Sequence, residues 1–423
     1  MAPRELLLGS FHAAIAAADP LRIVPAELPK PPRGRTVVVG AGKAAASMAL
    51  AVESHWPAGA PLEGIVITRY GHGLPTRRIR VVEAGHPVPD EQGEAAAREI
   101  LAAARSLGED DLLLALVSGG GSSLLALPVA GVPMAQLKAV TRALLASGAP
   151  IQDMNTVRKH LSAIQGGRLA AATRARVLAL VISDVTGDDP THIASGPCVA
   201  DPTTFGDAVA ILARYGVEPP PAVAAHLERG ARGETPETPK PGDPALARAE
   251  SRVIATAHAS LEAAAAFFRE RGISPLVLGD SVTGEASEVA KVYGALAREV
   301  RRYGAPARPP AALISGGETT VTLRGRGRGG RCSEFLLSLA VDLAGLDDTW
   351  ALACDTDGID GSEDNAGAIL APDSLARAAA LGLEAKARLA DNDGYGFFSA
   401  LGDLVVTGPT RTNVNDYRVI LVA

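Results

Sequence analysis

Short apolar runs alternate with longer stretches of helical periodicity along this chain, and the alternation limits its possible folds more than any other feature. Runs of strand length occupy residues 36–40, 64–68 and 78–85. Residues 90–107 space their apolar side chains as a helix does, with Asp90 as the expected N-cap. Strands that alternate with helices form right-handed crossovers, so we predict an α/β fold with a mainly parallel, Rossmann-like sheet.

A segment rich in proline, glycine and charge, residues 231–250, interrupts this rhythm. Strand and helix patterns return after it and continue to the end of the sequence. Because 423 residues exceed the usual size of one domain, we read this segment as a linker. We predict a Rossmann-like N-terminal domain over residues 1–235 and a smaller C-terminal α/β domain over residues 245–423.

Composition and charge exclude several classes of protein. The formal net charge of -6 disfavours nucleic acid as a partner. The three cysteines, Cys198, Cys332 and Cys354, have neither metal-ligand spacing nor a disulfide pattern, which predicts a reducing, cytoplasmic setting. Residues 1–20 place a Glu and a His among helically spaced apolar residues, so we expect an amphipathic helix there, and no membrane partner.

The first glycine turn follows the apolar run at residues 36–40. Gly42 lets the backbone approach a ligand, and Lys43 supplies a cation that suits a carboxylate or phosphate at the start of a helix. The segment is not a P-loop, because Val37 stands where the first glycine should be and Ala44 follows the lysine. A plain tight turn between strand and helix remains the alternative.

A second glycine turn follows the apolar run that begins at residue 111. It consists of Ser118, Gly119, Gly120, Gly121, Ser122 and Ser123. Three consecutive glycines cost conformational entropy, which a plain turn rarely requires. Their backbone N–H groups can form a nest for phosphate oxygens, and the serines add hydroxyl donors. We therefore favour a phosphate or substrate contact over a structural turn.

Polar residues of the next two segments are further candidates. Asn155 is interpreted as a helix N-cap, and Arg158, Lys159 and Arg168 as contacts for an anion, with a solvated basic helix as the equal alternative. Asp184 stands at the carboxyl end of a predicted parallel strand, the edge at which open α/β sheets bind ligands. A carboxylate there can hold Mg²⁺ or accept a hydroxyl proton.

The C-terminal half carries its own candidates. Glu318 follows a glycine turn, and Arg331 ends an arginine- and glycine-rich loop; an arginine beside a phosphate site stabilises the transferring group. Asp355 and Asp357 alternate with glycine in a manner typical of a cation loop, although the pattern of a calcium-binding EF-hand is incomplete. Asn413 lies in a polar turn before the last apolar run.

Taken together, these segments resemble the glycerate 2-kinase family with its characteristic C-terminal MOFRL domain. The stretches that carry the resemblance are VVVGAGKAAASMA, AGHPVPDEQG, LVSGGGSSLLALP, MNTVRKHLSAIQGGRLA, VISDVTGDDPTHIASGP, LISGGETTVTL, CDTDGIDGSEDNAGAI and TGPTRTNVNDYRV. They span nearly the whole chain in the family's order. The resemblance implies ATP and Mg²⁺, glycerate as the acceptor, 2-phosphoglycerate as the product, and a cleft between the two domains.

The resemblance also implies roles for individual residues. It makes Lys43, Asp184 and Arg331 the expected catalytic residues, and Asp184, Asp355 and Asp357 the expected magnesium ligands. The expected contacts with substrate or nucleotide are Gly42, Ser118, Gly119, Gly120, Gly121, Ser122, Ser123, Asn155, Arg158, Glu318 and Asn413. Two departures concern Cys332 and Ser333, where the family usually has Asn and Gln, and Arg411, where it usually has Gly.

Two other functions are compatible with parts of the sequence. Gly40 and Gly42 after a strand also suit an NAD(P)H-dependent hydroxypyruvate reductase, but Thr68, Arg69 and Tyr70 stand where such an enzyme needs an acidic residue for the ribose. A non-catalytic metabolite-binding protein is disfavoured by the carboxylates and cations at strand ends. The choice of the 2-hydroxyl rests on the resemblance alone, and the sequence leaves a homo-oligomer open.

Overall fold

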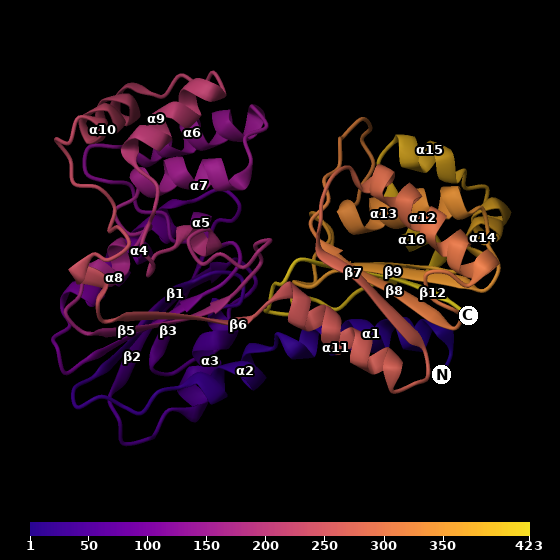
Figure 1. The fold of residues 1–423 in the computed structure, drawn as a ribbon, viewed down its shortest axis with the longest axis horizontal. Helices are drawn as coiled ribbons and strands as arrows, with labels where there is room; N and C mark the ends of the chain where they lie inside the picture. The colour runs from indigo at the N-terminus through magenta and orange to yellow at the C-terminus, as the bar shows by residue number, and fades with distance from the viewer. The chain divides into compact units, whose positions relative to one another are not determined.

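The computed structural model describes residues 1–423, which divide into two compact units, each with a six-stranded sheet (Figure 1). The N-terminal unit comprises Pro20–Ile254; the C-terminal unit comprises Met1–Asp19 and Ala255–Ala423. The predicted α/β fold is confirmed. The expected domain boundaries differ from this division in two places, because residues 1–19 join the C-terminal unit and residues 245–254 join the N-terminal one.

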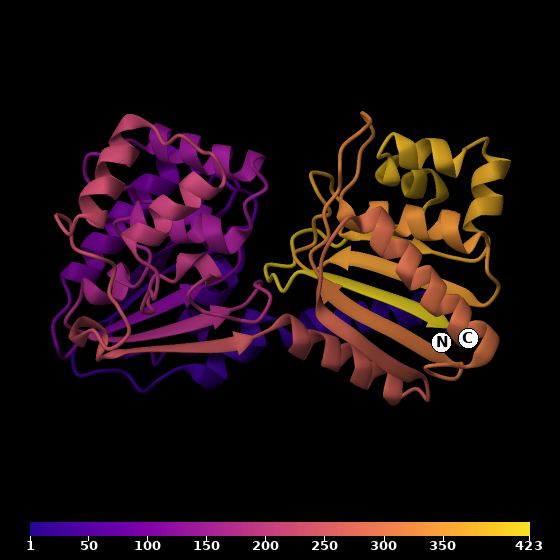
Figure 2. The same ribbon diagram turned by 45° about the horizontal axis from the view of Figure 1, so that its top comes forward.

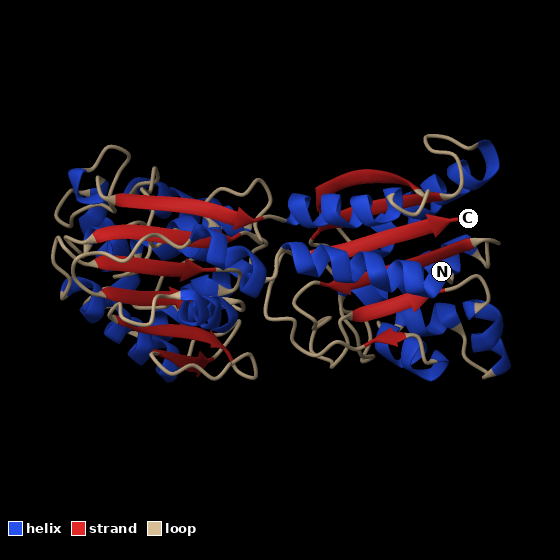
Figure 3. Cartoon of the chain, turned by 90° about the horizontal axis from the view of Figure 1, so that it is seen from below, coloured by secondary structure: helices blue, strands red, loops and turns tan.

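The sheet of the N-terminal unit has the strand order β3-β2-β1-β4-β5-β6. Its strands are β1 (Thr36–Ala41), β2 (Leu62–Arg69), β3 (Ile79–Ala84), β4 (Leu112–Val117), β5 (Arg176–Ile182) and β6 (Ala249–Ala255). The pairs among β1 to β5 are parallel, and Figure 3 shows the strands side by side. The chain runs outward to β3 and then returns to β4 on the other side of β1, which is the switch point where such sheets bind ligands.

Strands β1 and β4 are buried along their whole length, as expected for parallel strands covered on both faces. The helices of this unit are α2 (Pro20–Glu27), α3 (Ala45–His55), α4 (Glu91–Arg105), α5 (Gly121–Leu124), α6 (Met134–Ala146), α7 (Ile151–His160), α8 (Arg168–Ala171), α9 (Phe205–Arg214) and α10 (Pro221–Ala231), with short 3₁₀ turns at Ile193–Ser195 and Pro244–Leu246. Asp90 caps α4 as predicted, accepting a hydrogen bond from the N–H of Gly93 at 2.9 Å.

Helices α6, α7, α9 and α10 gather on one side of the N-terminal sheet (Figure 2) and share an apolar core of their own. Beside that core lies a buried ion pair, in which Lys159 Nζ is 2.7 Å from Asp201 Oδ1. Lys159 is therefore neither a ligand contact nor a solvated residue, because its charge is already matched inside the protein. Burial raises the pKa of Asp201, but the hydrogen bond and charge of Lys159 outweigh it and hold that pKa below its ordinary value.

The C-terminal unit has a mixed sheet with the order β11-β10-β9-β12-β8-β7. Its strands are β7 (Ser274–Val282), β8 (Ala311–Gly317), β9 (Thr349–Asp355), β10 (Gly367–Leu370), β11 (Leu404–Val405) and β12 (Asp416–Val422). Its helices are α1 (Pro3–Ala17), α11 (Ala257–Arg269), α12 (Ala286–Tyr303), α13 (Arg331–Leu343), α14 (Ser374–Ala380), α15 (Ala385–Ala390) and α16 (Gly394–Leu401). Because β12 is antiparallel to both β8 and β9, its first residue lies at the edge where those two strands end.

Helix α1 belongs to this unit because its apolar side chains complete one face of the C-terminal sheet. Leu7 and Phe11 are fully buried in the same cluster as residues of α11 and β12. The ring of Phe11 stacks on that of Tyr417 at 5.9 Å, and the Tyr417 hydroxyl donates to Ser10 at 2.8 Å. The stretch Pro3–Glu27 is long and apolar enough to cross a membrane by composition, but its first half buries these side chains inside the unit.

The buried pair in the N-terminal unit predicts a large loss of stability on Asp201→Ala. The change leaves the Lys159 ammonium buried without a counter-charge, which we expect to lower the free energy of unfolding by about 3–5 kcal/mol. Denaturant unfolding followed by the fluorescence of Trp56, in a Trp350→Phe background, reports on this unit. The exposed pair between Arg80 and Glu99 provides the control, since Glu99→Ala should cost less than about 1 kcal/mol. Equal effects of the two variants would contradict the assignment.

Candidate active site

The two glycine turns of the N-terminal unit form one structure at the carboxyl ends of β1 and β4. The N–H of Lys43 donates to the carbonyl of Gly119 at 2.8 Å, and the N–H of Ala44 donates to Ser118 Oγ at 3.0 Å. Gly42 has a φ of +141°, and a Cβ on it would lie 2.1 Å from Ser118 Oγ. Only glycine permits this approach, so the turns that the sequence presents separately meet at the switch point of the sheet.

The side chains of Lys43 and His86 lie against the second turn, which we call the glycine loop (residues 118–123). A Cβ built on Gly120 would lie 2.9 Å from His86 Nε2 and 3.4 Å from Lys43 Cγ. The imidazole of His86 and the aliphatic stem of Lys43 therefore border the same half-buried residue of the loop. The sequence predicts Lys43 for this place. His86 lies in the stretch AGHPVPDEQG, which helps to carry the family resemblance, but it is not among the site residues expected from the sequence.

A chain of hydrogen bonds anchors the glycine loop from the other side. Ser122 Oγ lies 2.9 Å from Ser195 Oγ, and Ser195 Oγ donates to Asn155 Oδ1 at 3.2 Å. Arg158 Nη1 also donates to Asn155 Oδ1, while Asn155 Nδ2 donates to the carbonyl of His192 at 3.1 Å. The structure thus brings together Ser122, Asn155 and Arg158, as expected of site residues.

The interpretation of Asn155 as a helix N-cap is wrong. Pro150 occupies the N-cap of α7, and Asn155 lies in the middle of that helix with its side chain directed to residues far away in sequence. Burial lowers the pKa of Arg158 to about 10, which leaves the guanidinium charged at neutral pH. Arg158 therefore keeps its positive charge next to Asn155 throughout the neutral pH range.

The segment that supplies Ser195 has an unusual backbone. Ala194 has a φ of 50° and Ser195 a φ of 59°, both in the left-handed region, which costs non-glycine residues roughly 1–2 kcal/mol each. Both residues are buried, and a Cβ on Gly121 would lie 2.6 Å from that of Ala194. Such strain persists where the surroundings fix it and is concentrated at functional sites. Both residues lie in the stretch VISDVTGDDPTHIASGP, which carries the family resemblance, but neither of them is among the site residues expected from the sequence.

Asp184 lies at the same edge of the sheet. β5 ends at Ile182, and its register with β4 pairs Val181 with Val117, so Asp184 follows its strand much as the glycine loop follows β4. The side chain is half-buried. In contrast, Asp189 accepts a hydrogen bond from the N–H of Thr191 at 2.8 Å, which gives it a role in the turn. The geometry therefore keeps Asp184 as the candidate carboxylate of this segment.

The candidates of the C-terminal unit also converge, around Arg331 at the start of α13. Its guanidinium nitrogens lie 2.6 Å from Glu318, 2.8 Å from Asp355 and 2.7 Å from Asp416. Although burial lowers it, the charges of these carboxylates raise the pKa of Arg331 well above its ordinary value. Glu318 is the only exposed member of the three, so an incoming anion would most easily exchange with its carboxylate.

Two further charged residues complete this arrangement. Arg418 is almost fully buried on β12; it pairs with Asp416 and donates to the carbonyl of Gly316 at 2.8 Å. Asp360 accepts hydrogen bonds from the N–H groups of Cys332 and Ser333, both at 2.9 Å, and so fixes the first turn of α13. The alternation of Asp416 and Arg418 within an apolar strand is a signal that sequence reasoning missed, since residues two apart share one face of a strand.

The aspartates expected to bind magnesium have other partners in this structure. Asp355 accepts hydrogen bonds from Arg331 and from the N–H of Asp357 at 3.0 Å, and Asp357 accepts one from the N–H of Ile359 at 2.8 Å. Nowhere in the chain do three or more His, Cys, Asp or Glu side chains form a group that could hold a metal ion. Any magnesium would therefore need oxygens from a bound substrate to complete its shell.

The loop that carries Asn413 packs onto the same edge of the C-terminal sheet. The N–H of Val414 donates to Thr356 Oγ1 at 2.9 Å, and the N–H of Thr410 donates to the carbonyl of Asp357 at 3.0 Å. Asn413 is buried there. Arg411 has a φ of 60°, a left-handed conformation that favours glycine, which explains why glycine is usual at this position in the family that the sequence resembles.

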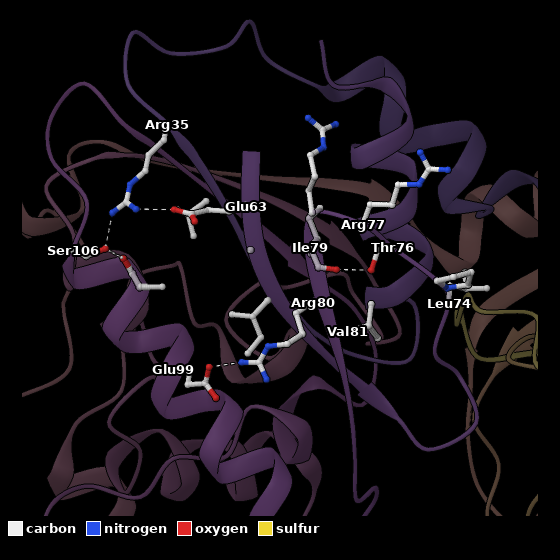
Figure 4. Close-up of a pocket in the computed structure, with 16 residues that line it drawn as sticks. Arg35, Glu63, Leu74, Thr76, Arg77, Ile79, Arg80, Val81, Glu99 and Ser106 are labelled. Atoms are coloured by element: carbon white, nitrogen blue, oxygen red, sulfur yellow. Dashed lines mark hydrogen bonds and ion pairs between the residues drawn. The ribbon is translucent and has the colours of Figure 1, made fainter. Parts of the chain in front are cut away.

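A cavity of about 740 Å³ lies at the opposite edge of the N-terminal sheet, at the amino ends of the strands (Figure 4). Figure 4 shows two ion pairs among its charged side chains, Arg35 with Glu63 at 2.6 Å and Arg80 with Glu99. Arg77 and Arg78 also line this cavity, so positive side chains outnumber negative ones there, but none of the candidate residues named above lines it. The chemistry-bearing residues are instead gathered at the carboxyl edge.

Glu334 on α13 provides a pH-dependent prediction for the C-terminal unit. Burial raises the pKa of this carboxyl to about 7, despite a hydrogen bond from Asn392 Nδ2 at 3.1 Å. The folded protein therefore binds a proton here between about pH 4.5 and 7 that the unfolded chain releases, and this part of the stability is lost as the pH rises through that range.

We expect Glu334→Gln to remove this loss. The variant should gain about 2 kcal/mol over the native protein at pH 8 compared with pH 5, since one pKa unit corresponds to about 1.4 kcal/mol. Denaturant unfolding across that pH range measures the difference. The matched control is Glu288→Gln at an exposed site, which should leave the pH profile unchanged. Parallel profiles for Glu334→Gln and the native protein would refute the assignment.

Comparison with known proteins identifies the family. A domain of unknown function, DUF4147, matches residues 6–228, and the MOFRL family matches residues 311–416. A D-glycerate 2-kinase of Thermotoga maritima is 39% identical over 422 residues, which cover 99% of this chain and 98% of that protein. An Agrobacterium vitis protein named "Putative hydroxypyruvate reductase" is 55% identical over 422 residues, covering 99% of this chain and 94% of its own.

A solved structure gives the same result. The crystal structure of glycerate kinase from Thermotoga maritima superimposes with a TM-score of 0.88 at 37% identity, and 99% of each chain is covered. The resemblance expected from the sequence is thus confirmed over the full chain. This protein belongs to the glycerate 2-kinase family and carries that family's MOFRL domain in its C-terminal unit.

Proposed function

We propose that this protein is an ATP-dependent glycerate 2-kinase that transfers the γ-phosphoryl group of ATP to the 2-hydroxyl of D-glycerate in the cytoplasm. The observation that carries the proposal is the position of Lys43 against the glycine loop at the switch point of a parallel sheet. Backbone N–H groups and a flexible cation together suit phosphate oxygens. The choice of D-glycerate as the substrate follows the name of the Thermotoga maritima relative. The three buried free cysteines agree with a reducing compartment.

Each cluster has its own part in the proposed reaction. The hydroxyl oxygen of glycerate forms a bond to the γ-phosphorus, the bond to the bridging oxygen breaks, and ADP leaves with the electron pair. Lys43 neutralises charge on the transferring group, and Asp184 orients the hydroxyl or takes its proton. Arg331 binds an anionic group of a substrate by exchanging the exposed carboxylate of Glu318. Gly42, the glycine loop and Asn413 position the substrates through their backbone or side chains.

Magnesium is proposed as a companion of ATP. Mg²⁺ usually keeps several waters and binds one or two protein carboxylates together with substrate phosphates, so the absence of a larger ligand cluster does not oppose it. Asp184, Asp355 and Asp357 are the proposed ligands. When bound, the ion neutralises charge on the phosphates.

A direct assay distinguishes this function from its rivals. Purified protein is incubated with MgATP and D-glycerate, and enolase is added without phosphoglycerate mutase. Formation of phosphoenolpyruvate, followed by ultraviolet absorbance, requires 2-phosphoglycerate and supports the proposal. ADP without phosphoenolpyruvate would indicate phosphorylation of the 3-hydroxyl. If neither forms, and NADPH is oxidised when hydroxypyruvate is supplied, the protein is a reductase, the activity named for the Agrobacterium vitis relative.

Substitution of Lys43 tests its proposed role. Lys43→Ala removes the cation beside the glycine loop, and we expect kcat to fall by a factor of about 10²–10³, as for other groups that stabilise transition-state charge. Lys291→Ala on the exposed face of α12 is the control and should retain native activity. A kcat near the native value in the Lys43 variant would remove this residue from the mechanism.

Substitution of Gly120 tests the geometry of the loop. Gly120→Ala combines a left-handed φ of +79° with a contact on His86 and Lys43, whereas Gly233→Ala has a similar φ of +75° with no neighbour within 4 Å. Both variants should lose roughly 1–2 kcal/mol of stability through the backbone. Only Gly120→Ala should also lose at least about ten-fold in kcat/KM, because the two side chains must move. Equal activity in both variants would show that the contact is irrelevant to turnover.

A further inference from the structure

An apolar pocket of about 120 Å³ opens directly beside the glycine loop, and the mechanism above leaves it unused. Its lining comes from the segment after β3, from the glycine loop and from helices α6 and α7. Among the lining residues, Leu127 and Leu137 are buried, and Ser122 and Ser123 connect the pocket to the loop. The pocket therefore adjoins the proposed phosphate site within one unit of the protein.

Large apolar side chains at this pocket are exposed in the free protein. Val88 is 54% exposed and Leu145 is 68% exposed, although both line the pocket. Pro87 and Pro89 flank Val88 and add rigid apolar surface. Exposed apolar residues that gather around a concavity are typical of a ligand site, because a flat apolar ligand covers them on binding.

One polar atom in this pocket lacks a partner. Gln165 is fully buried, and its Nε2 donates to the carbonyls of Ser122 at 2.9 Å and Leu125 at 3.2 Å. Its Oε1 is buried and accepts no hydrogen bond. An unsatisfied buried acceptor is unfavourable, so a ligand that brings an N–H donor would gain a hydrogen bond at this atom.

We propose that this pocket binds the nucleobase of ATP, an inference that rests on the proposed kinase function. A purine offers flat apolar faces for Val88 and Leu145 and an exocyclic amino group for Gln165 Oε1. At about 120 Å³ the pocket is smaller than the cavity of about 150 Å³ that encloses benzene, so a bound base would be only partly enclosed and would rest on the exposed side chains at the pocket mouth. Glycerate is a poor occupant, because its carboxylate and hydroxyls would lose water against an apolar surface.

The charges at the pocket agree with this orientation. Lys138, Arg142 and Arg158 line it together with the serines of the glycine loop. With the base between the apolar residues, the phosphates extend toward the loop and Lys43, where the transfer is proposed. All residues that line the pocket belong to the N-terminal unit.

Filling the pocket tests the proposal. Thr141 lines it from α6, and Thr141→Phe places a ring where the base would lie. We expect the dissociation constant of ADP, measured by calorimetry on the full chain, to rise at least ten-fold, and the KM for ATP to rise likewise. The KM for glycerate should stay within two-fold. The control is Ala135→Phe, which adds the same ring to an exposed position of α6 outside the pocket.

The outcomes separate this inference from the kinase function. Native binding of ADP by a folded Thr141→Phe variant would overturn the pocket assignment while leaving the kinase intact. Weaker ADP binding in a protein that does not phosphorylate glycerate would support a nucleotide pocket and refute the proposed reaction. A selective rise in the KM for glycerate would make this the acceptor site and would also overturn the assignment.

Photolabelling provides a second test that does not depend on folding of a variant. The native protein is irradiated with 8-azido-ADP, which attaches to residues beside the base, and labelled peptides are identified by mass spectrometry. Labelling of residues 87–89 or 137–145, abolished by excess ATP, is the expected result. ATP-sensitive labelling confined to other segments would overturn the proposal.

Discussion

The parallel pairing of β1 with β4 determines where the N-terminal unit can carry out chemistry. Because the chain leaves β1 in one direction and returns to β4 on the other side, the turns after both strands meet at one edge of the sheet. Glycines at the contact let backbone hydrogen bonds join the turns, and the helices behind them hold that arrangement in place. Lys43 takes its position from this junction, while His86 and Ser195 reach the glycine loop from other segments and Asp184 follows β5 at the same edge.

In the C-terminal unit, ion pairs bring the candidate residues together. Its sheet is mixed, so strand direction alone does not collect the loops, but β8 and β9 end where β12 begins. Arg331 pairs with three carboxylates at that edge, and Arg418 pairs with one of them, Asp416. The attraction between these opposite charges offsets part of the free energy that it costs to remove them from water. The exposed Glu318 is the member that a ligand can replace, whereas Asp416 is buried and fixes the arginines. The same ions therefore serve both architecture and recognition.

Features with a local pattern could be predicted from the sequence. The strands, the helix capped by Asp90, the glycine turns and the motif order of the family all follow from residues close together in the chain. Features that depend on distant partners could not. Asn155 has the side chain of a typical N-cap, but it lies inside α7. Its side chain accepts a hydrogen bond from Ser195, forty residues away in the sequence. The sequence does not show that Lys159 is buried against Asp201, or that His86 lies against the glycine loop, because each contact joins residues far apart in the chain.

The position of α1 has a consequence for how the protein is made. Helix α1 precedes the N-terminal unit in the chain and is synthesised before it, yet its packing partners α11 and β12 are synthesised only after that entire unit. Domains tend to fold as units during synthesis. The N-terminal unit can therefore fold while the apolar side chains of Leu7 and Phe11 are still exposed, because the residues that bury them have not yet been made. Helix α1 is thus synthesised before the N-terminal unit but buried after it, when β12 brings Tyr417 against Phe11 and Ser10.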